Sequence, residues 1–372
     1  MSRILVLCYE YPPIGGGGGR VAAQVAEALV ERGHQVRVVT SGMTHLPRRA
    51  MISGVEVIRV RAFRRREDTC SVLEMLLWVI AAFPVALWEA VRWHPKVMHA
   101  HFAVPTGAVA WLVHQFTRIP YVLTSHLGDV PGGVPEQTDR LFKKIKWLTV
   151  PIWRGAARIT AVSSFVAELA QKAYEIKPLV VLNGIKLPKQ QSKKESTVPQ
   201  LLLVGRLSVQ KNPLLAIQAL TLLREYPWTL KIIGDGPLVV VAREETKRLY
   251  LQGRISFLGW LSADEVRRAM EQADLLLMPS LSEGLPMVGV EALAHGLAIV
   301  GSRIGGLQDI LLDGQNGAAF DLATGAAGMA EALRPFLKDH EFLQTAQQAS
   351  WELAATFEWE RSIDLYEEVL VN

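Results

Sequence analysis

The chain has 372 residues, half of them hydrophobic and a fifth charged, which excludes a disordered protein and is long enough for two domains. Its two cysteines, Cys8 and Cys70, exclude a disulfide framework and fit a reducing, cytoplasmic compartment. Because neither lies in a Cys-x-x-Cys pair, a structural zinc site is not expected. The net charge of +4 is uneven: residues 1–186 carry 23 Lys and Arg against 13 Asp and Glu, and residues 187–372 carry 17 against 23.

The first segment of the chain indicates strand, loop, helix and strand. An apolar run at Arg3–Cys8 is too short for a signal-peptide core and predicts a buried strand. Five glycines at 15–19 follow it, then a helical pattern at 20–32 that Gly33 ends, and a second strand at Gln35–Thr40. Two apolar strands around one helix form a βαβ unit, which predicts a parallel sheet.

The same alternation continues along the chain and is interrupted once. Further strands are expected at Lys96–Ala100, Tyr121–Ser125, Arg158–Val162 and Leu179–Leu182. The polar, lysine-rich segment 187–199 then predicts a linker. Beyond it, strands at Leu201–Val204, Leu230–Ile233, Ile255–Leu258, Leu275–Met278 and Ala298–Val300 alternate with helices from Pro213 and near 239–250, 263–272 and 286–295.

This pattern predicts an α/β protein with two doubly wound, Rossmann-like domains facing a cleft. The first would occupy residues 1–186 and the second residues 200–355. A last helix within 356–372 is expected to pack back on the first domain.

One apolar segment, Met75–Trp88, leaves three interpretations open. It contains the helix breaker Pro84 and is flanked by Glu74 and Glu89. Because a spanning helix needs about 20 apolar residues, the segment fits a helix packed on its own domain, an interfacial membrane contact or, least well, a spanning helix. An anionic surface is favoured by nearby basic residues, some interleaved with apolar ones: Arg64, Arg65, Arg66, Arg140, Leu141, Phe142, Lys143, Lys144, Ile145, Lys146 and Trp147.

The glycine run at 15–19 lies between a strand and a helix, where backbone amides can approach an anionic ligand. A dinucleotide-binding loop would need an acidic residue about 20 positions further on, at the end of the second strand. That strand ends Val39-Thr40-Ser41, which disfavours a nicotinamide or flavin enzyme. A loop that only lets two domains approach each other is the alternative.

Two segments of the second half each place polar residues after an apolar strand. Arg206 and Lys211 follow the strand at Leu201–Val204, where two cations match a diphosphate and Asn212 is expected to cap the next helix. Glu283 and Glu291 follow the strand at Leu275–Met278, the second inside an apolar helix. A buried acid there is costly unless it is paired with a local arginine or bonded to a ligand.

The segment E-G-L-P-M-V-G-V-E at 283–291 resembles the E-x7-E motif of the retaining GT-B glycosyltransferases of family 4. Other segments similar to this family occur in the expected order over essentially the whole chain: Tyr9-Glu10-Tyr11-Pro12-Pro13 with the glycine run, His99-Ala100-His101-Phe102, Val181-Leu182-Asn183-Gly184-Ile185, Gly205-Arg206-Leu207, Lys211-Asn212-Pro213, Ile233-Gly234-Asp235-Gly236-Pro237 and Phe357-Glu358-Trp359.

The resemblance implies a metal-independent transferase that uses a nucleotide-diphosphate sugar and retains its anomeric configuration. Arg206 and Lys211 would hold the diphosphate, Glu291 the ribose and Glu283 the transferred sugar, with His126 beside that sugar. Further donor contacts would come from Gly16, Gly17, Gly205, Gly234, Asp235, Gly284, Leu285, Pro286, Met287 and Val288. The family often has His-Gly-x-Asp where this chain has His126-Leu127-Gly128-Asp129, which leaves the role of Asp129 open, and His126 could also be a core or capping residue.

The acceptor and partners follow less directly. The basic, apolar-studded first half favours a lipid-linked glycan or polysaccharide precursor as acceptor, with peripheral contact on the cytoplasmic face of an anionic membrane. No recognised nucleic-acid motif occurs, so nucleic acid is not expected as a partner. Two other classes remain as alternatives: a nucleotide-sugar epimerase on the same fold and a non-catalytic nucleotide-sugar-binding protein. The sequence names neither the sugar nor the base.

Overall fold

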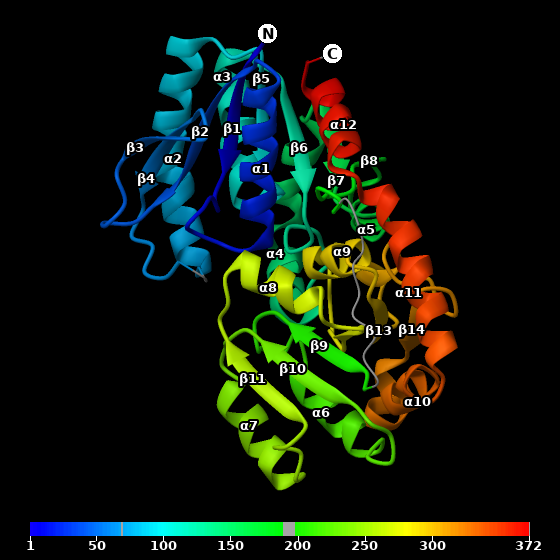
Figure 1. Cartoon of the computed structure of the whole chain (residues 1–372). Helices are drawn as coiled ribbons and strands as arrows, with labels where there is room; N and C mark the ends of the chain where they lie inside the picture. Colours follow the sequence, from blue (N-terminus) through cyan, green and yellow to red (C-terminus); the bar gives the residue numbers. More distant parts are fainter. Residues whose placement is uncertain (68–69, 189–197, 372) are drawn as a thin grey trace. The chain divides into compact units, whose positions relative to one another are not determined.

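The computed structural model describes residues 1–67, 70–188 and 198–371, without the side chains of residues 135–144. The chain forms two compact units, which are coloured along the sequence in Figure 1. Unit 1 contains Met1–Asn183 together with Glu360–Asn372, and unit 2 contains Gly184–Trp359. The sequence places the corresponding boundaries at 186, 199 and 355. Most of the expected linker, residues 189–197, lies outside the described residues.

Unit 1 is built on an eight-stranded sheet of order β3-β4-β2-β1-β5-β6-β7-β8. All neighbouring strands are parallel except β3 and β4, which form an antiparallel hairpin at one edge. The central strands are buried along almost their whole length, as expected when helices cover both faces of a parallel sheet. The strands are β1 Arg3–Cys8, β2 Gln35–Gly42, β3 Arg49–Ile52, β4 Val55–Arg61, β5 Val97–His101, β6 Tyr121–Ser125, β7 Arg158–Ala161 and β8 Leu179–Val180.

The helices of unit 1 include one that comes from the far end of the chain. They are α1 Gly17–Glu31, α2 Val72–Trp93, α3 Ala108–Thr117, α4 Pro135–Arg154, α5 Ser164–Tyr174 and, after unit 2, α12 Trp359–Val371. Arg32, just beyond α1, forms ion pairs of 2.7–2.8 Å with three carboxylates of α12: Glu360, Asp364 and Glu367. The hydroxyl of Ser362 donates to the Leu182 carbonyl at 2.7 Å. These contacts attach α12 to unit 1.

The apolar segment of the first half forms α2, which packs on the sheet of its own unit. Ser71 and Glu74 form a capping box that begins the helix, and Pro84 lies inside it. Trp78 is buried and its ring meets that of Tyr9 edge-on at 5.5 Å. One face of α2 belongs to the core of unit 1, as expected for a helix packed on its own domain. By length and composition alone, α2 is also the one helix of the described residues that could cross a membrane, which is weak evidence for a span.

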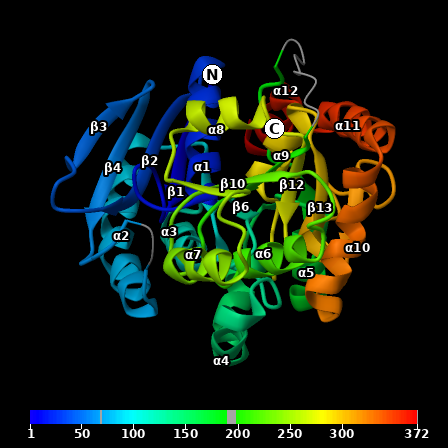
Figure 2. The same ribbon diagram turned by 60° about the horizontal axis from the view of Figure 1, so that its bottom comes forward.

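Unit 2 is built on a six-stranded, fully parallel sheet of order β11-β10-β9-β12-β13-β14. Its strands are β9 Gln200–Val204, β10 Thr229–Ile233, β11 Ile255–Gly259, β12 Leu275–Met278, β13 Ala298–Ser302 and β14 Gly317–Phe320. Its helices are α6 Pro213–Thr221, α7 Val239–Arg248, α8 Ala263–Met270, α9 Met287–Ala294, α10 Gly325–Lys338 and α11 His340–Ala354. Helices α10 and α11, neither of which the sequence predicts, lie near β13 on the β14 side of the sheet (Figure 2).

The strand orders fix where each sheet can bind a ligand. In unit 1 the chain order reverses between the neighbours β1 and β5, and in unit 2 between β9 and β12. Loops at the carboxyl ends of strands on either side of such a switch point diverge and leave a crevice between them. The candidate residues lie in these loops and in those of the adjacent strands.

Candidate active site

In unit 2 the loops that follow β9 and β12 are joined by hydrogen bonds. The Leu281 amide donates to the Gln210 carbonyl at 2.7 Å, and the Gln210 side-chain amide donates to the Ser282 carbonyl at 2.9 Å. The two polar segments that the sequence singles out, 205–213 and 279–291, therefore meet at the switch point. Gln210 makes this connection, and no signal in the sequence distinguishes it from a surface residue.

At this junction, Glu283 is held by two donors. Its Oε1 atom lies 2.6 Å from Lys211 Nζ and 2.6 Å from the hydroxyl of Ser280. Glu283 is only 6% exposed and Ser280 only 1%. A buried carboxylate is costly unless a cation and hydrogen bonds compensate it, which these contacts do. Ser280 is a site residue that the sequence reasoning missed, although it stands three positions before Glu283.

Glycines allow the ends of β9 and β10 to approach each other closely. Gly205 has a φ of 138°, and a Cβ atom at Gly234 would lie 2.0 Å from the Gly205 carbonyl oxygen. The neighbouring Asp235 is exposed, and its carboxylate accepts from the Gly236 amide at 2.6 Å. Arg206, on the same edge, is exposed as well. The backbone is thus open to a ligand in front of these strands.

The short helix α9 presents its N-terminus on the β12 side. Pro286 is the N-cap, and the amides of the first helical residues, Met287 and Val288, have no partner inside a helix by geometry. Such free amides favour an anion. Glu291 lies one turn after Met287 and therefore on the same helical face. The sequence predicts a buried acid here, and Glu291 is partly buried at this face.

Two helices, α6 and α1, begin differently from what the sequence predicts. Asn212 adopts a left-handed conformation (φ 49°, ψ 51°) and forms no side-chain cap, so Pro213 begins α6 without one. In unit 1, α1 begins at Gly17 rather than at residue 20, with Gly16 as N-cap. The Glu10 carboxylate accepts from the Gly16 amide at 3.0 Å and so fixes the start of the helix.

The glycine loop of unit 1 leaves space for a ligand. A Cβ atom at Gly16 or Gly17 would meet no atom within 4 Å. A Cβ atom at Gly18 would instead lie 2.4 Å from the Phe102 ring and 3.2 Å from Nδ1 of His126. The N-terminus of α1 and the His126 ring therefore face each other across a gap that only glycine permits.

His126 follows β6 and belongs to a buried histidine cluster. Its Nε2 atom lies 3.1 Å from Nδ1 of His101, and its ring is tilted over Phe102 at a centroid distance of 4.4 Å. Burial lowers the pKa of His126 to about 4 and that of His99 to about 3, and it lowers the pKa of His101 as well. The three rings are therefore neutral at neutral pH.

Asp129, whose role the sequence leaves open, organises the loop that carries His126. Its Oδ1 atom accepts from the amides of His126 and Leu127 at 3.0 and 3.1 Å, and Oδ2 accepts from the Ala103 amide at 2.7 Å. The displaced glycine of the His-x-x-Asp segment does not prevent this. Asp129 thus positions His126 and is itself only 1% exposed.

Two doubly wound α/β units, with polar loops and helix N-termini at their switch points, form an architecture suited to binding a nucleotide. Residues 185–351 match the family model of the glycosyl transferases group 1, and residues 16–184 match the glycosyl transferase 4-like domain. The chain therefore belongs to this glycosyltransferase family. It is 30% identical to the glycogen synthase of Mycobacterium tuberculosis, across 96% of the chain and 92% of that protein.

Other relatives differ in their named activities. The N-acetyl-alpha-D-glucosaminyl L-malate synthase of Bacillus anthracis is 26% identical over 99% of the chain and 96% of its own length. Among solved structures, sucrose-phosphate synthase from Thermosynechococcus elongatus matches with a TM-score of 0.82 at 19% identity, covering 99% of both chains. HepE of Anabaena in complex with UDP-glucose matches at 0.76, with 19% identity, over 100% of this chain and 99% of its own. These structures confirm the expected GT-B fold.

Proposed function

We propose that the protein transfers a sugar from a nucleotide-diphosphate donor to a lipid-linked glycan or polysaccharide precursor, with retention of anomeric configuration and without a bound metal. The observation that carries the proposal is the Glu283–Lys211–Ser280 cluster beside the N-terminus of α9. The sugar–phosphate bond breaks, a bond to the acceptor oxygen forms, and the leaving phosphate takes the acceptor proton. Support for a nucleotide-sugar donor comes from the similar HepE structure, which is a complex with UDP-glucose.

Different residues of unit 2 bind different parts of the donor. Arg206, Lys211 and the amides from Leu285 to Val288 stabilise the charge that develops on the diphosphate. Lys211 pairs with Glu283, so a phosphate would compete for the ammonium group and leave the carboxylate to the sugar hydroxyls. Glu291 holds the ribose. Because fixed cations and amides neutralise the leaving group, no metal ion is required for this step.

In unit 1 the amides around Gly16 and Gly17 face the phosphates and the sugar, and His126 lies beside the sugar. His126 is neutral at neutral pH, because burial keeps its pKa low, so it acts as a hydrogen-bonding group rather than as a cation. A lipid-linked acceptor would place the protein at the cytoplasmic face of a membrane.

The two glutamates provide the test. Ribose contacts are much the same in the ground and transition states, so Glu291→Gln should raise the donor KM and leave kcat nearly intact. Glu283→Gln should lower kcat, because its contacts change as the anomeric bond breaks. A hydrogen bond to a charged group contributes about 1.5–3 kcal/mol, so each effect should be roughly tenfold to a hundredfold.

Steady-state kinetics on both variants, with circular dichroism to check folding, measures these effects. A reversal of the two effects would reverse the roles, and changes below about twofold would move the active site elsewhere. A product that requires an acceptor separates a transferase from an epimerase, and donor hydrolysis separates either from a non-catalytic binding protein. Thermal shifts with UDP, GDP and ADP identify the base. Unchanged activity after EDTA treatment is expected.

A further inference from the structure

The outward face of α2 carries a continuous apolar stripe. Six exposed apolar residues follow helical spacing along one face from the first turn to the last: Leu73, Leu76, Ile80, Pro84, Trp88 and Val91. The exposed Arg92 borders the stripe in the last turn, with its guanidinium group 5.2 Å from the centre of the Trp88 ring. The rings of Phe83 and Phe116 lie 5.7 Å apart, and Phe116, which is 70% exposed, extends the patch onto α3. Exposed apolar patches of this extent mark an interaction surface.

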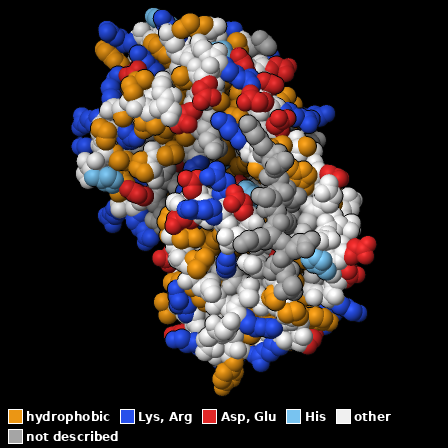
Figure 3. All heavy atoms as spheres, viewed as in Figure 1, with side chains coloured by type: hydrophobic (Ala, Val, Ile, Leu, Met, Phe, Trp, Pro, Cys, Tyr) orange, Lys and Arg blue, Asp and Glu red, His pale blue; other side chains and the backbone are white. Residues whose placement is uncertain are grey.

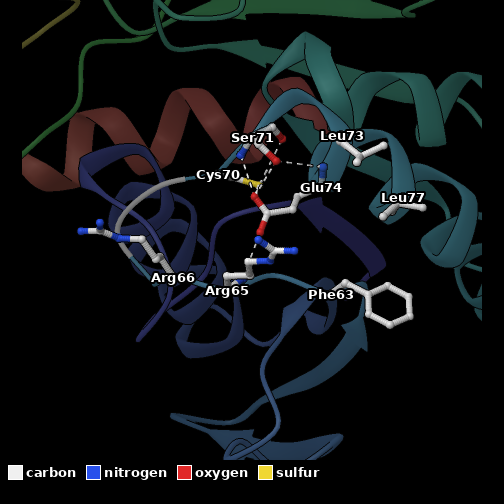
Figure 4. A pocket seen from close by; sticks show the side chains of 8 residues that line it. All are labelled: Phe63, Arg65, Arg66, Cys70, Ser71, Leu73, Glu74 and Leu77. Carbon is white, nitrogen blue, oxygen red and sulfur yellow. Dashed lines mark hydrogen bonds between the residues drawn. The ribbon is translucent and has the colours of Figure 1, made fainter.

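Both acidic residues of α2 are directed away from this stripe or neutralised. Glu89 is only 2% exposed and forms ion pairs with Arg37 at 2.8 Å and with Arg49 at 2.5 Å. The Glu74 carboxylate is turned onto the Ser71 amide and hydroxyl, as Figure 4 shows. It lies at the positive end of the helix, which offsets its charge.

Arginines line the stripe on one side and at its N-terminal end. Arg48 and Arg61 of the β3–β4 edge line a hollow together with Pro84 and Trp88 of α2. At the start of the helix, Arg65 and Arg66 line a second pocket with the apolar residues Phe63, Leu73 and Leu77 (Figure 4). The space-filling view shows hydrophobic side chains with Lys and Arg beside them in this region of unit 1 (Figure 3).

We propose that the stripe and its arginines, which we call the α2 surface, dock unit 1 on a bilayer that contains anionic lipids. The apolar side chains enter the headgroup–acyl boundary while the arginines contact the lipid phosphates. The helix lies along the membrane rather than across it, because its inner face packs on the sheet. This identifies the surface that would meet the lipid-linked acceptor of the proposed function.

The sequence predicts a second membrane-contacting segment at 140–148, of which the structure describes only some side chains. The side chains of its residues up to 144 lie outside the described ones. Trp147 and Leu148 are 72% and 51% exposed. They are compatible with such a contact but are not needed for it.

Vesicle flotation of the full chain tests the proposal without donor or acceptor. Binding is expected to vesicles of phosphatidylcholine with phosphatidylglycerol, and it should be weak to phosphatidylcholine alone or at high salt. The affinity of the double variant Leu76→Gln/Ile80→Gln for anionic vesicles should fall by about tenfold or more, because both apolar anchors are lost. Arg65→Gln/Arg66→Gln should lose most of the preference for anionic vesicles.

The matched control is Val240→Gln, which replaces a residue 61% exposed on α7 of unit 2 and should leave binding unchanged. Thermal unfolding checks that each variant folds. Equal binding to neutral and anionic vesicles, or wild-type binding by the α2 variant, would overturn the proposal. A dimer of the wild-type chain that the α2 variant no longer forms, as measured by light scattering, would also overturn the proposal. The α2 surface would then join two copies of the chain. Donor kinetics remain as the separate test of the proposed function.

Discussion

His101 has only one of its ring nitrogens satisfied. Nδ1 meets Nε2 of His126 at 3.1 Å, whereas Nε2 is buried and has no hydrogen-bond partner among the residues that the structure describes. An orphaned N–H group costs more than an orphaned acceptor, so the proton belongs on Nδ1 of His101, which then donates to His126. His126 must carry its own proton on Nδ1. It therefore presents an N–H donor toward Gly18 and the site.

The tautomers can be measured directly. In ¹⁵N-labelled protein at neutral pH, the imidazole shifts of His126 should report a protonated Nδ1 and an unprotonated Nε2. His101→Asn keeps a side-chain donor and should preserve this state better than His101→Leu, which should also lower kcat. A protonated Nε2 on His126 would contradict the assignment.

The same cluster predicts how stability depends on pH. Burial lowers the pKa values of His99 and His126 from 6.5 in the unfolded chain to about 3 and about 4. Between pH 6.5 and the lowered pKa values, the unfolded state binds more protons than the folded state. The free energy of unfolding should therefore fall as the pH drops below 6.5. Each such histidine contributes about 1.4 kcal/mol per pH unit.

Calorimetry between pH 7 and 4 measures this dependence. The midpoint temperature should decrease steadily as the pH falls. The slope should be shallower for His99→Gln, which removes one titrating group. An identical slope in that variant would show that other groups dominate.

At the scale of elements, the 3₁₀ turn Gly305–Leu307 sets the position of the Glu283 loop. A Cβ atom at Gly306 would lie 1.7 Å from the Glu283 carbonyl oxygen, which the backbone cannot accommodate without moving. Gly306→Ala should therefore displace the loop, lower stability by roughly 1–3 kcal/mol and weaken nucleotide binding. Gly253→Ala is the control, because a Cβ atom there meets nothing within 4 Å. Calorimetric titration with nucleotide and thermal unfolding measure both effects.

Much of this architecture follows from the sequence. Apolar runs bounded by turn residues predict the central strands, and Tyr121–Ser125 agrees residue for residue with β6. The β3–β4 hairpin is harder to predict, because its outer strand at Arg49–Ile52 is short and only partly buried. Helices α10 and α11 follow β14, a strand that contains only one large apolar residue, Phe320.

The sequence predicts candidate-site residues whose type and position after a strand indicate their chemistry. It does not predict residues whose role depends on contacts made only in the folded chain. Glu283 and Lys211 are recognisable as charged residues after strands, and their direct contact follows from the adjacency of β9 and β12. Gln210 acts through two hydrogen bonds and His101 through one, and each bond joins the residue to a neighbouring loop. Residue type and spacing contain no information on such bonds.

At the scale of the whole molecule, we expect the two units to move when donor binds. The polar composition of 187–199 is typical of a flexible connection, and both units contribute candidate donor-binding residues. The radius of gyration from small-angle X-ray scattering should decrease at saturating nucleotide sugar. An unchanged radius would count against closure, and the Glu291→Gln variant should need more ligand to reach the same decrease.

The position of α12 has a consequence for the order in which the protein is made. Unit 1 includes Glu360–Asn372, so during translation its sheet emerges long before its last helix, with all of unit 2 synthesised in between. Tyr366 of that helix covers the buried ring of His99 at 5.7 Å, and Glu367 bonds His34 at 2.9 Å. Until α12 is synthesised, the nascent first unit lacks these contacts. We therefore expect the first unit to complete its folding only after the second has been synthesised.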